Sequence, residues 1–271
     1  MNRRFNPFLQ AIYARWPEFG LRYGGMVAAL IVLGVSARRG WWSYVPLSLA
    51  ALVILSYFLL GNLWVMSQVY GRTGLNPHQV LFDMGRVQPT DGLVFIDVGW
   101  RHRSIAIAGR LTTGQTTIVD VYSPQWAASR ALARWRSRLP QAESDPRIFW
   151  RNGAINLLPL PDASVTTVMM CQVLAEFWQR GDQLTLLQEI RRILTPDGRL
   201  LLAEPIRSQT TWIALGAASL HRKAAPYWQN LLVEAGFHIR AQKGLAGIIQ
   251  CYQADRPSPE PGYQLSLDLV I

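Results

Sequence analysis

The longest apolar stretch of the chain is a run of 26 residues, 41–66, that carries no charge. It reads WWSYVPLSLAALVILSYFLLGNLWVM, with aromatic residues at both ends and a proline near its start. At ~1.5 Å per residue, a helix of this length crosses a hydrocarbon core of ~30 Å with some tilt. Trp and Tyr rings favour the two interfaces of a bilayer. The pattern therefore predicts a membrane-spanning helix over residues 41–66.

A second uncharged stretch, residues 23–37, precedes this run. Its fifteen residues are few for a span, but the long side chains of Arg22 and Arg38 can reach the interface from its two ends. A signal peptide is the alternative, because residues 35–37 are similar to a cleavage site. A further apolar run follows almost at once, which favours a helical hairpin with its first span at about 22–38.

From about residue 90 onward, strand-like and helix-like segments alternate, which is typical of a parallel α/β sheet. The pattern predicts strands at 93–98, 116–121, 147–150, 165–170, 199–203, 237–242 and 247–252, and helices at 123–138, 184–194 and 226–235. The predicted organisation is a membrane anchor over 1–72, a linker over 73–90, an α/β domain over 91–256 and a tail over 257–271. One extra strand in the tail is left open.

The arginines predict the orientation of the hairpin. The chain has a net charge of +10, and residues 1–72 carry seven arginines against a single acid, Glu18. More arginines flank the hairpin than stand in its turn, so the positive-inside rule predicts a multi-pass membrane protein with both termini and the C-terminal domain in the cytoplasm. Because the basic excess lies beside apolar runs, the bilayer is the expected partner and nucleic acid is not.

The two cysteines change this picture little. Cys171 and Cys251 are far apart and have no Cys or His at ligand spacing, so neither a disulfide framework nor a metal site is indicated. A reducing compartment is expected.

Three segments of the α/β region match one known family. They are LLQEIRRILTPDGRLLLAEP (186–205), NLLPLPDASVTTV (156–168) and EAGF (234–237). In this order and spacing, residues 93–254 resemble the class I S-adenosylmethionine-dependent methyltransferases, in the small-molecule, methyltransferase type 11-like branch that includes quinone C-methyltransferases. The resemblance implies a Rossmann-like seven-stranded sheet with helices on both faces and a reversed final strand. It also implies S-adenosylmethionine as the cofactor, bound beyond the carboxyl ends of the first strands.

The resemblance assigns cofactor-binding roles near the first three strands. Asp97 and Gly99 match the acid and the first glycine of the family's loop, and Asp120 matches the acid that pairs with the ribose hydroxyls. The full set implied is Asp97, Gly99, Arg101, Asp120, Gly153 and Ala154. A carboxylate suits the ribose because it accepts two hydrogen bonds at once.

The glycine loop departs from the family pattern. Arg101 and Arg103 replace glycines that let the backbone approach the cofactor, and Gly153 stands where the family usually has an Asp beside the adenine. Three readings stay open: Arg101 pairs with the cofactor's carboxylate, both side chains point outward, or both fill the cleft.

Catalytic residues are weakly indicated, because this family often works by placing its substrates and excluding water. The weak candidates are Glu176, Glu204 and His221, and the two glutamates suit helix capping or solvated positions equally well. We expect a membrane-anchored methyltransferase acting on a lipophilic small molecule such as a quinone, an isoprenoid or a lipid. The alternative is a methyltransferase-fold binding or scaffold protein without catalysis. The sequence leaves the acceptor atom and the oligomeric state open.

Overall fold

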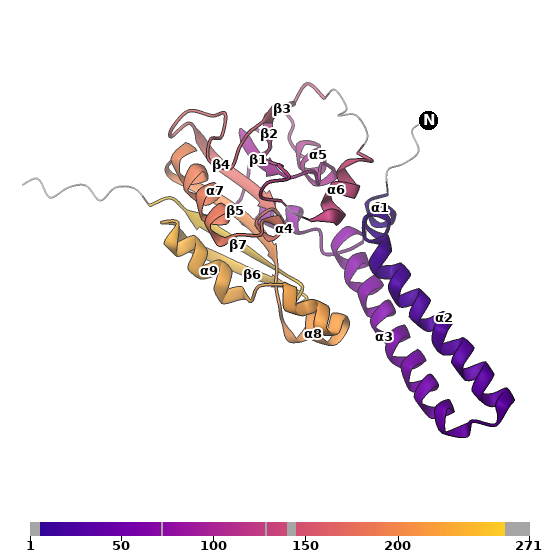
Figure 1. The fold of residues 1–271 in the computed structure, drawn as a ribbon. Coiled ribbons are helices and arrows are strands. Elements are labelled where there is room, and N and C mark those ends of the chain that lie inside the picture. Colours follow the sequence, from indigo (N-terminus) through magenta and orange to yellow (C-terminus); the bar gives the residue numbers. More distant parts are fainter. Residues whose placement is uncertain (1–5, 72, 128, 140–144, 258–271) are drawn as a thin grey trace, which may run out of the picture.

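The structure is a computed structural model that describes residues 6–71, 73–127, 129–139 and 145–257. It consists of a long helical hairpin that projects from an α/β domain (Figure 1). The short helix α1 (Pro7–Ala14) leads into α2 (Trp16–Arg39), and a 3-10 turn (Trp42–Tyr44) leads into α3 (Val45–Tyr70). Gly40 ends α2 in the left-handed conformation, with φ +71°, where a side chain would be strained. The predicted helical hairpin and its turn are present.

Both long helices are apolar and exposed. Their most apolar windows have mean hydropathies of 1.6 for α2 and 2.1 for α3, and only 6% and 17% of those windows are buried within the protein. Length and composition are therefore sufficient for two membrane spans, which is weak support for a transmembrane hairpin.

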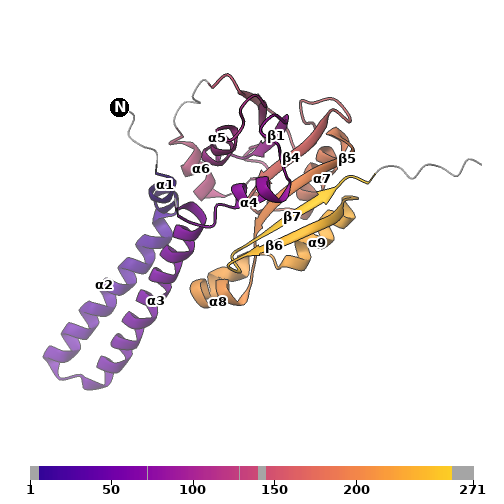
Figure 2. The same cartoon turned by 180° about the vertical axis from the view of Figure 1, so that it is seen from behind.

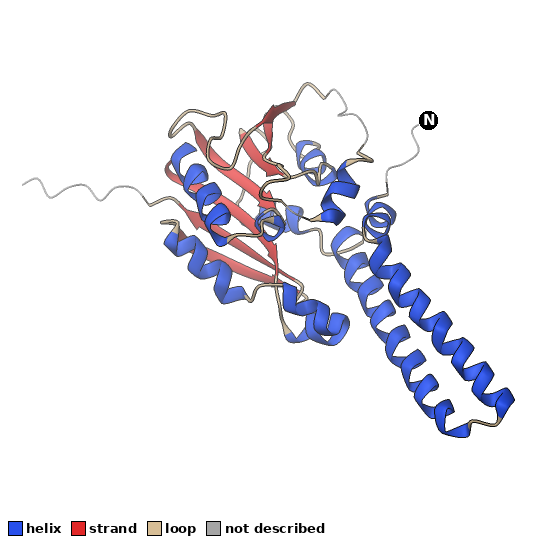
Figure 3. Cartoon of the chain, viewed as in Figure 1, coloured by secondary structure: helices blue, strands red, loops and turns tan. Residues whose placement is uncertain are grey.

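The sheet confirms the predicted fold class. Seven strands lie in the order β3-β2-β1-β4-β5-β7-β6, with β7 antiparallel to both of its neighbours. Figure 3 shows the sheet in red between the helices. Their bounds are β1 Leu93–Asp97, β2 Thr116–Asp120, β3 Ile148–Asn152, β4 Val165–Cys171, β5 Leu194–Pro205, β6 His238–Leu245 and β7 Ile249–Asp255. Because β1 to β5 are parallel, their carboxyl ends meet at one edge, where open α/β sheets bind ligands.

Helices cover both faces of the sheet, and the two views from opposite sides show this layering (Figures 1 and 2). One face packs against α6 (Arg130–Arg136), α7 (Arg180–Ile193) and α9 (Ala225–Glu234). The other face packs against α4 (Pro77–Met84), α5 (His102–Ala108) and α8 (Gln209–Leu215). Two 3-10 turns, η2 (Leu174–Glu176) and η3 (Gly216–His221), complete the description.

Two local expectations differ from the structure. The helix expected over 123–138 begins only at Arg130, because Ser129, rather than Ser123, caps it by accepting a hydrogen bond from the Leu132 N–H at 3.2 Å. The segment expected to be a linker contains α4, which buries Leu81 and Phe82 against the sheet. Of the expected tail, all but residue 257 lies outside the described residues.

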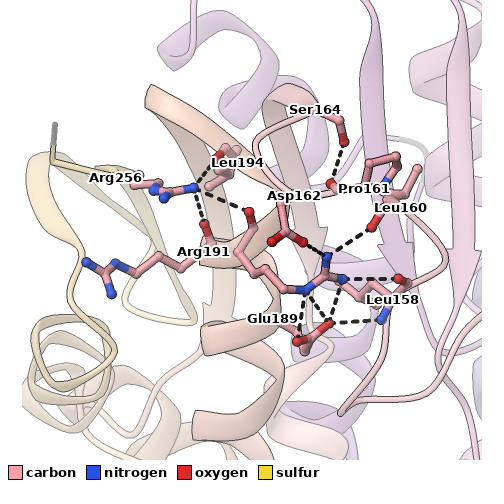
Figure 4. A network of polar contacts seen from close by, with 10 residues as sticks. Leu158, Leu160, Pro161, Asp162, Ser164, Glu189, Arg191, Leu194 and Arg256 are labelled. Atoms are coloured by element: carbon pink, nitrogen blue, oxygen red, sulfur yellow. Dashed lines mark hydrogen bonds and ion pairs between the residues drawn. The ribbon is translucent and has the colours of Figure 1, made fainter. Parts of the chain in front are cut away.

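A polar network fixes the segment that leads into β4 (Figure 4). Arg192 of α7 pairs with Asp162 and with Glu189, the latter at 2.9 Å between Nη2 and Oε2. It also donates to the carbonyl oxygens of Leu158 and Leu160, at 3.2 Å each. Two of the family-like sequence segments are therefore held together by one guanidinium, whose planar fork suits several acceptors at once.

Candidate cofactor site

The carboxyl end of β1 forms a tight loop around a buried acid. Asp97 is 1% exposed, and its Oδ1 accepts a hydrogen bond from the Trp100 N–H at 2.8 Å. Burial, together with the neighbouring Asp120, raises the pKa of Asp97 to about 6, although hydrogen bonds from the loop backbone oppose the shift. Gly99 has φ +122°, a conformation that favours glycine. Asp97 and Gly99 therefore shape the tight turn that follows β1.

Asp120 ends β2 directly beside Asp97 in the sheet register. Its carboxylate accepts a hydrogen bond from the Tyr122 N–H at 3.1 Å and is paired with Arg136, at 2.8 Å between Nη2 and Oδ2 and 3.0 Å between Nη1 and Oδ1. The same guanidinium donates to the Val98 carbonyl at 2.9 Å and lies 4.1 Å from the centre of the Tyr122 ring. The acid implied to bind the ribose is thus engaged by an arginine of α6.

Arg136 also covers the glycine. A Cβ atom placed on Gly99 would lie 2.8 Å from Cγ of Arg136, so the side chain passes directly over the loop on its way to Asp120. The space between Gly99 and Asp120, where the resemblance expects the ribose, contains this side chain.

Aromatic rings also pack against the loop. Trp135 donates from Nε1 to the Gly99 carbonyl at 2.9 Å, and its ring lies 4.8 Å from that of Trp100. Tyr70, the last residue of α3, lies 5.6 Å from Trp100 and 5.9 Å from Trp135. The base of the hairpin therefore packs onto the loop that the family uses for its cofactor.

The two arginines of the loop make contacts within the protein. The Arg101 guanidinium lies 5.1 Å from the centre of the Trp150 ring. Arg103 is 1% exposed and donates to the Cys171 carbonyl at 3.2 Å and to Oε1 of Gln172 at 2.9 Å. Arg103 therefore ties α5 to the end of β4, a structural role that the sequence did not indicate.

Gly153 and Ala154 lie at the end of β3. The Gly153 N–H donates to the Asp120 carbonyl at 2.9 Å, and a Cβ on Gly153 would lie 2.7 Å from Cγ1 of Val119. Ala154 bridges to Leu157 across the following turn. This stretch is therefore adjacent to Asp120, where the resemblance expects the adenine side of the cofactor.

Two of the three catalytic candidates meet at the ends of β4 and β5. Glu204 is fully buried and accepts hydrogen bonds from the backbone N–H groups of Val173, Leu174 and Ala175, at 3.0, 2.9 and 3.1 Å. Burial raises its pKa to about 8. Glu204 thus holds the turn η2 in place, the capping role expected as one alternative.

Glu176 ends the same turn, and His221 ends η3. Burial raises the pKa of Glu176, and the opposing effect of the Arg15 guanidinium is smaller. His221 is exposed. Glu176 is only partly buried, whereas Glu204 is fully buried and held by three backbone N–H groups, so Glu176 is the more accessible of the two carboxyls.

The comparisons with known proteins agree with the fold. Residues 100–202 match the family model described as "Methyltransferase domain". A probable S-adenosylmethionine-dependent methyltransferase of Mycolicibacterium smegmatis is 42% identical over 62 residues, which is 23% of each chain. A SAM-dependent methyltransferase from Aquifex aeolicus superposes with a TM-score of 0.52 at 15% identity, covering 66% of this chain and 89% of its own. The cyclase SpnF superposes with a TM-score of 0.52 at 16% identity, covering 70% and 83%.

The order and direction of the strands give the C-terminal region the fold of the class I methyltransferases, and the sequence match within it is to the methyltransferase domain family. Residues 100–202 carry the methyltransferase domain family's sequence pattern, and the cofactor of that family is S-adenosylmethionine.

The backbone at the ends of β1 and β3 and the carboxylate of Asp120 are suited to this cofactor. Asp97, Gly99 and Asp120 stand at adjacent strand ends, and residues 153 and 154 flank Asp120. The exception is Arg136, whose pairing with Asp120 must open before ribose hydroxyls can reach the carboxylate. An arginine at the end of a helix is usually solvated, so no sequence pattern predicts Arg136 at this site.

Proposed function

We propose that this protein is a membrane-anchored S-adenosylmethionine-dependent methyltransferase that acts on a lipophilic small molecule. The observation that carries the proposal is the alignment of Asp97, Gly99 and Asp120 on two adjacent strand ends in a methyltransferase domain. When bound, the cofactor supplies an electrophilic methyl group. The protein's own contribution is to hold the ribose at Asp120, to place the acceptor and to exclude water.

The packing of the hairpin supports a lipophilic substrate. Tyr70 of α3 contacts the loop of β1 through Trp100, so an apolar helix of spanning length ends directly at the binding edge. A substrate dissolved in a bilayer is thereby brought close to the cofactor without passing through water. Alkaline carbonate should leave the protein in the membrane pellet, and its release into the supernatant would contradict the anchor.

A second candidate function is a binding or scaffold module that has lost catalysis. The pairing of Arg136 with Asp120 favours it, because the guanidinium already satisfies the ribose acid. The fold does not choose between the two functions, since the cyclase SpnF shares it and its name describes another reaction.

Calorimetry of the full chain in nanodiscs separates the two functions. We expect S-adenosylmethionine to bind, and Asp120→Ala to weaken binding by ~1.5–3 kcal/mol, the loss typical of a hydrogen bond to a charged group. Asp162→Ala is the control, because this acid lies in the Arg192 network and not at the loop. Absence of binding in the natural protein would favour the scaffold function, and equal binding by the Asp120 variant would remove its ribose role.

A further inference from the structure

The segment between β5 and α9 carries large apolar side chains on its outside. Residues 208–220 contain no charged residue, and they include α8 and most of η3. Trp212 and Ile213 of α8 are 50% and 53% exposed, and Leu220 of η3 is 55% exposed. A surface helix in water normally turns its polar side outward, so this surface is not the one that an aqueous environment favours.

The inward side of the same segment includes polar side chains. Thr211 and Ser219 are 0% exposed, and their hydroxyls are satisfied locally. Ser219 donates to the Gly216 carbonyl at 2.7 Å, and Thr211 shares a capping box with Ser208. Of the four large apolar side chains in the segment, only Leu215 is buried. This reversed arrangement indicates that the outer face meets a surface other than water.

The segment lies against the hairpin at a fixed place. Helix α8 is beside α3 in both views of the molecule (Figures 1 and 2). The backbones approach closely, because Gly61 of α3 faces the Ala214 carbonyl with no side chain between them. Leu60 and Ile213 line one groove between the two helices, and Leu60 is 65% exposed. The exposed apolar surface of α8 is therefore continuous with that of α3.

The contact with α3 also defines a depth. The uncharged run 41–66 has its middle near residue 53, and Gly61 lies ~11 Å beyond that point along the helix axis. Half of a hydrocarbon core measures ~15 Å. If α3 spans the bilayer, as the proposed function requires, α8 lies just inside the boundary between acyl chains and headgroups.

Two cations stand where the segment begins and ends. The Arg207 N–H donates to the Lys223 carbonyl at 2.8 Å, so the chain enters and leaves the segment at one point. Both residues are exposed. Lys and Arg side chains at this level reach the phosphates of a lipid surface. An apolar protrusion with a basic base is typical of elements that lie in a membrane interface.

We propose that residues 208–222 form a second membrane contact, distinct from the spanning hairpin. Trp212, Ile213 and Leu220 insert into the leaflet that α3 enters from the domain side, at the boundary of headgroups and acyl chains. The contact rests on the proposed function for the membrane position of α3. Because the segment directly follows β5, it holds the binding edge of the sheet against the lipid surface.

Site-specific labels in the full chain test this insertion. Trp212→Cys and Leu220→Cys are labelled with nitrobenzoxadiazole and reconstituted in phosphatidylcholine–phosphatidylglycerol vesicles that carry a nitroxide near the start of the acyl chain. We expect the nitroxide to remove more than about half of the fluorescence at both positions, because interfacial elements lie at this depth. Val233→Cys, 64% exposed on α9, is the matched control and should lose less than about a tenth. The unsubstituted chain controls for labelling, since Cys171 and Cys251 are buried.

The apolar surface is tested by the paired change Trp212→Asp, Ile213→Asp with the label at position 220. Two carboxylates are costly among acyl chains, so nitroxide quenching at position 220 should fall at least about threefold. Val233→Asp should leave it unchanged. The melting temperature in detergent should also stay unchanged, because both replaced side chains are half exposed. Equal quenching in the paired variant would contradict the insertion.

A label at Val53→Cys, 68% exposed near the middle of the run, reports on the anchor itself. It should be quenched by a nitroxide near the end of the acyl chain. Quenching at position 53 but not at 212 and 220 overturns this second contact and leaves the anchor standing. Quenching at none of the three refutes both. Blue-shifted emission at 212 and 220 without quenching would also overturn the contact, because a protein surface rather than lipid would then cover the segment.

Discussion

The two halves of the sheet differ in what their family-like residues do. In the half built from β4, α7 and β5, Arg192, Asp162 and Glu189 form a network that fixes the chain before β4. In the half built from β1, α5 and β2, Asp97 and Asp120 stand at the expected strand ends, but Arg136 occupies the second acid and covers Gly99. Family-like residues in the first half are therefore evidence for the fold alone. Only the residues of the second half bear on cofactor binding.

This difference explains how a clear sequence match and an altered cofactor loop coexist in one chain. The Arg192 network joins α7 to the segment before β4 and does not involve the loop after β1. In the loop after β1, Arg101 and Arg103 stand where the family pattern has glycines, and they contact Trp150 and the end of β4. Changes in the two halves should therefore be separable by experiment.

The largest expected effect is on stability, from Arg192→Ala. Loss of this guanidinium leaves Asp162, Glu189 and two carbonyl oxygens without their donor, and we expect unfolding to become easier by about 2–4 kcal/mol. Denaturant unfolding measures this, and cofactor affinity should not change. Arg180→Ala on the same helix is the control, since its exposed pair with Glu234 is worth less than about 1 kcal/mol. If the Arg192 variant were as stable as the natural protein but did not bind the cofactor, the two halves of the sheet would not have the separate roles described above.

The converse change, Arg136→Ala, should act on the cofactor. With Asp120 freed and Gly99 uncovered, S-adenosylmethionine no longer has to displace the guanidinium, and we expect its Kd to fall about tenfold. Calorimetry measures the change, and Arg130→Ala, an exposed arginine of the same helix, is the matched control. Weaker binding in the Arg136 variant would instead make this arginine part of the cofactor site.

The smallest expected effect is a pH dependence that involves both halves. Asp97 has its pKa raised from 3.8 to about 6, and Glu204 from 4.5 to about 8, in both cases chiefly by burial. Within these windows the folded state holds protons that the unfolded state has lost, so stability falls as the pH rises through them, by at most about 1.4 kcal/mol per pH unit for each group. Thermal unfolding across this range measures the slope. Glu204→Gln should flatten its upper part and leave the part due to Asp97, and an unchanged slope above about pH 6 would exclude Glu204 as its cause.

The sequence predicted the elements of the fold well, because buried strands and amphipathic helices leave local patterns. The seven strands and α7 and α9 follow from hydrophobic periodicity, and the hairpin follows from its uncharged runs. The late start of α6 was missed, since Ser123-Pro124 and Ser129 are both plausible helix starts and tertiary packing of Trp135 decides between them.

The candidate site was predictable only where strand ends define it. Asp97, Gly99 and Asp120 lie where motif spacing places them, whereas Arg136, Trp135 and Tyr70 come from helices whose positions depend on packing. Tyr70 belongs to the predicted membrane anchor, and no local pattern indicates that an anchor contributes to the binding edge. Local sequence patterns do not indicate which distant segments of the chain will contact each other.

One glycine has a mechanical consequence for the whole protein. Any side chain at Gly61 would collide with the Ala214 carbonyl, so α8 is seated against the backbone of α3 at one height only. Gly61 lies nine residues before the end of α3, or ~13 Å along its axis. If α3 crosses a bilayer, this contact fixes the distance between the α/β domain and the bilayer centre. A bulkier residue at position 61 would push α8 away from α3 and would change how the α/β domain is seated on the hairpin, without any alteration of the loop after β1.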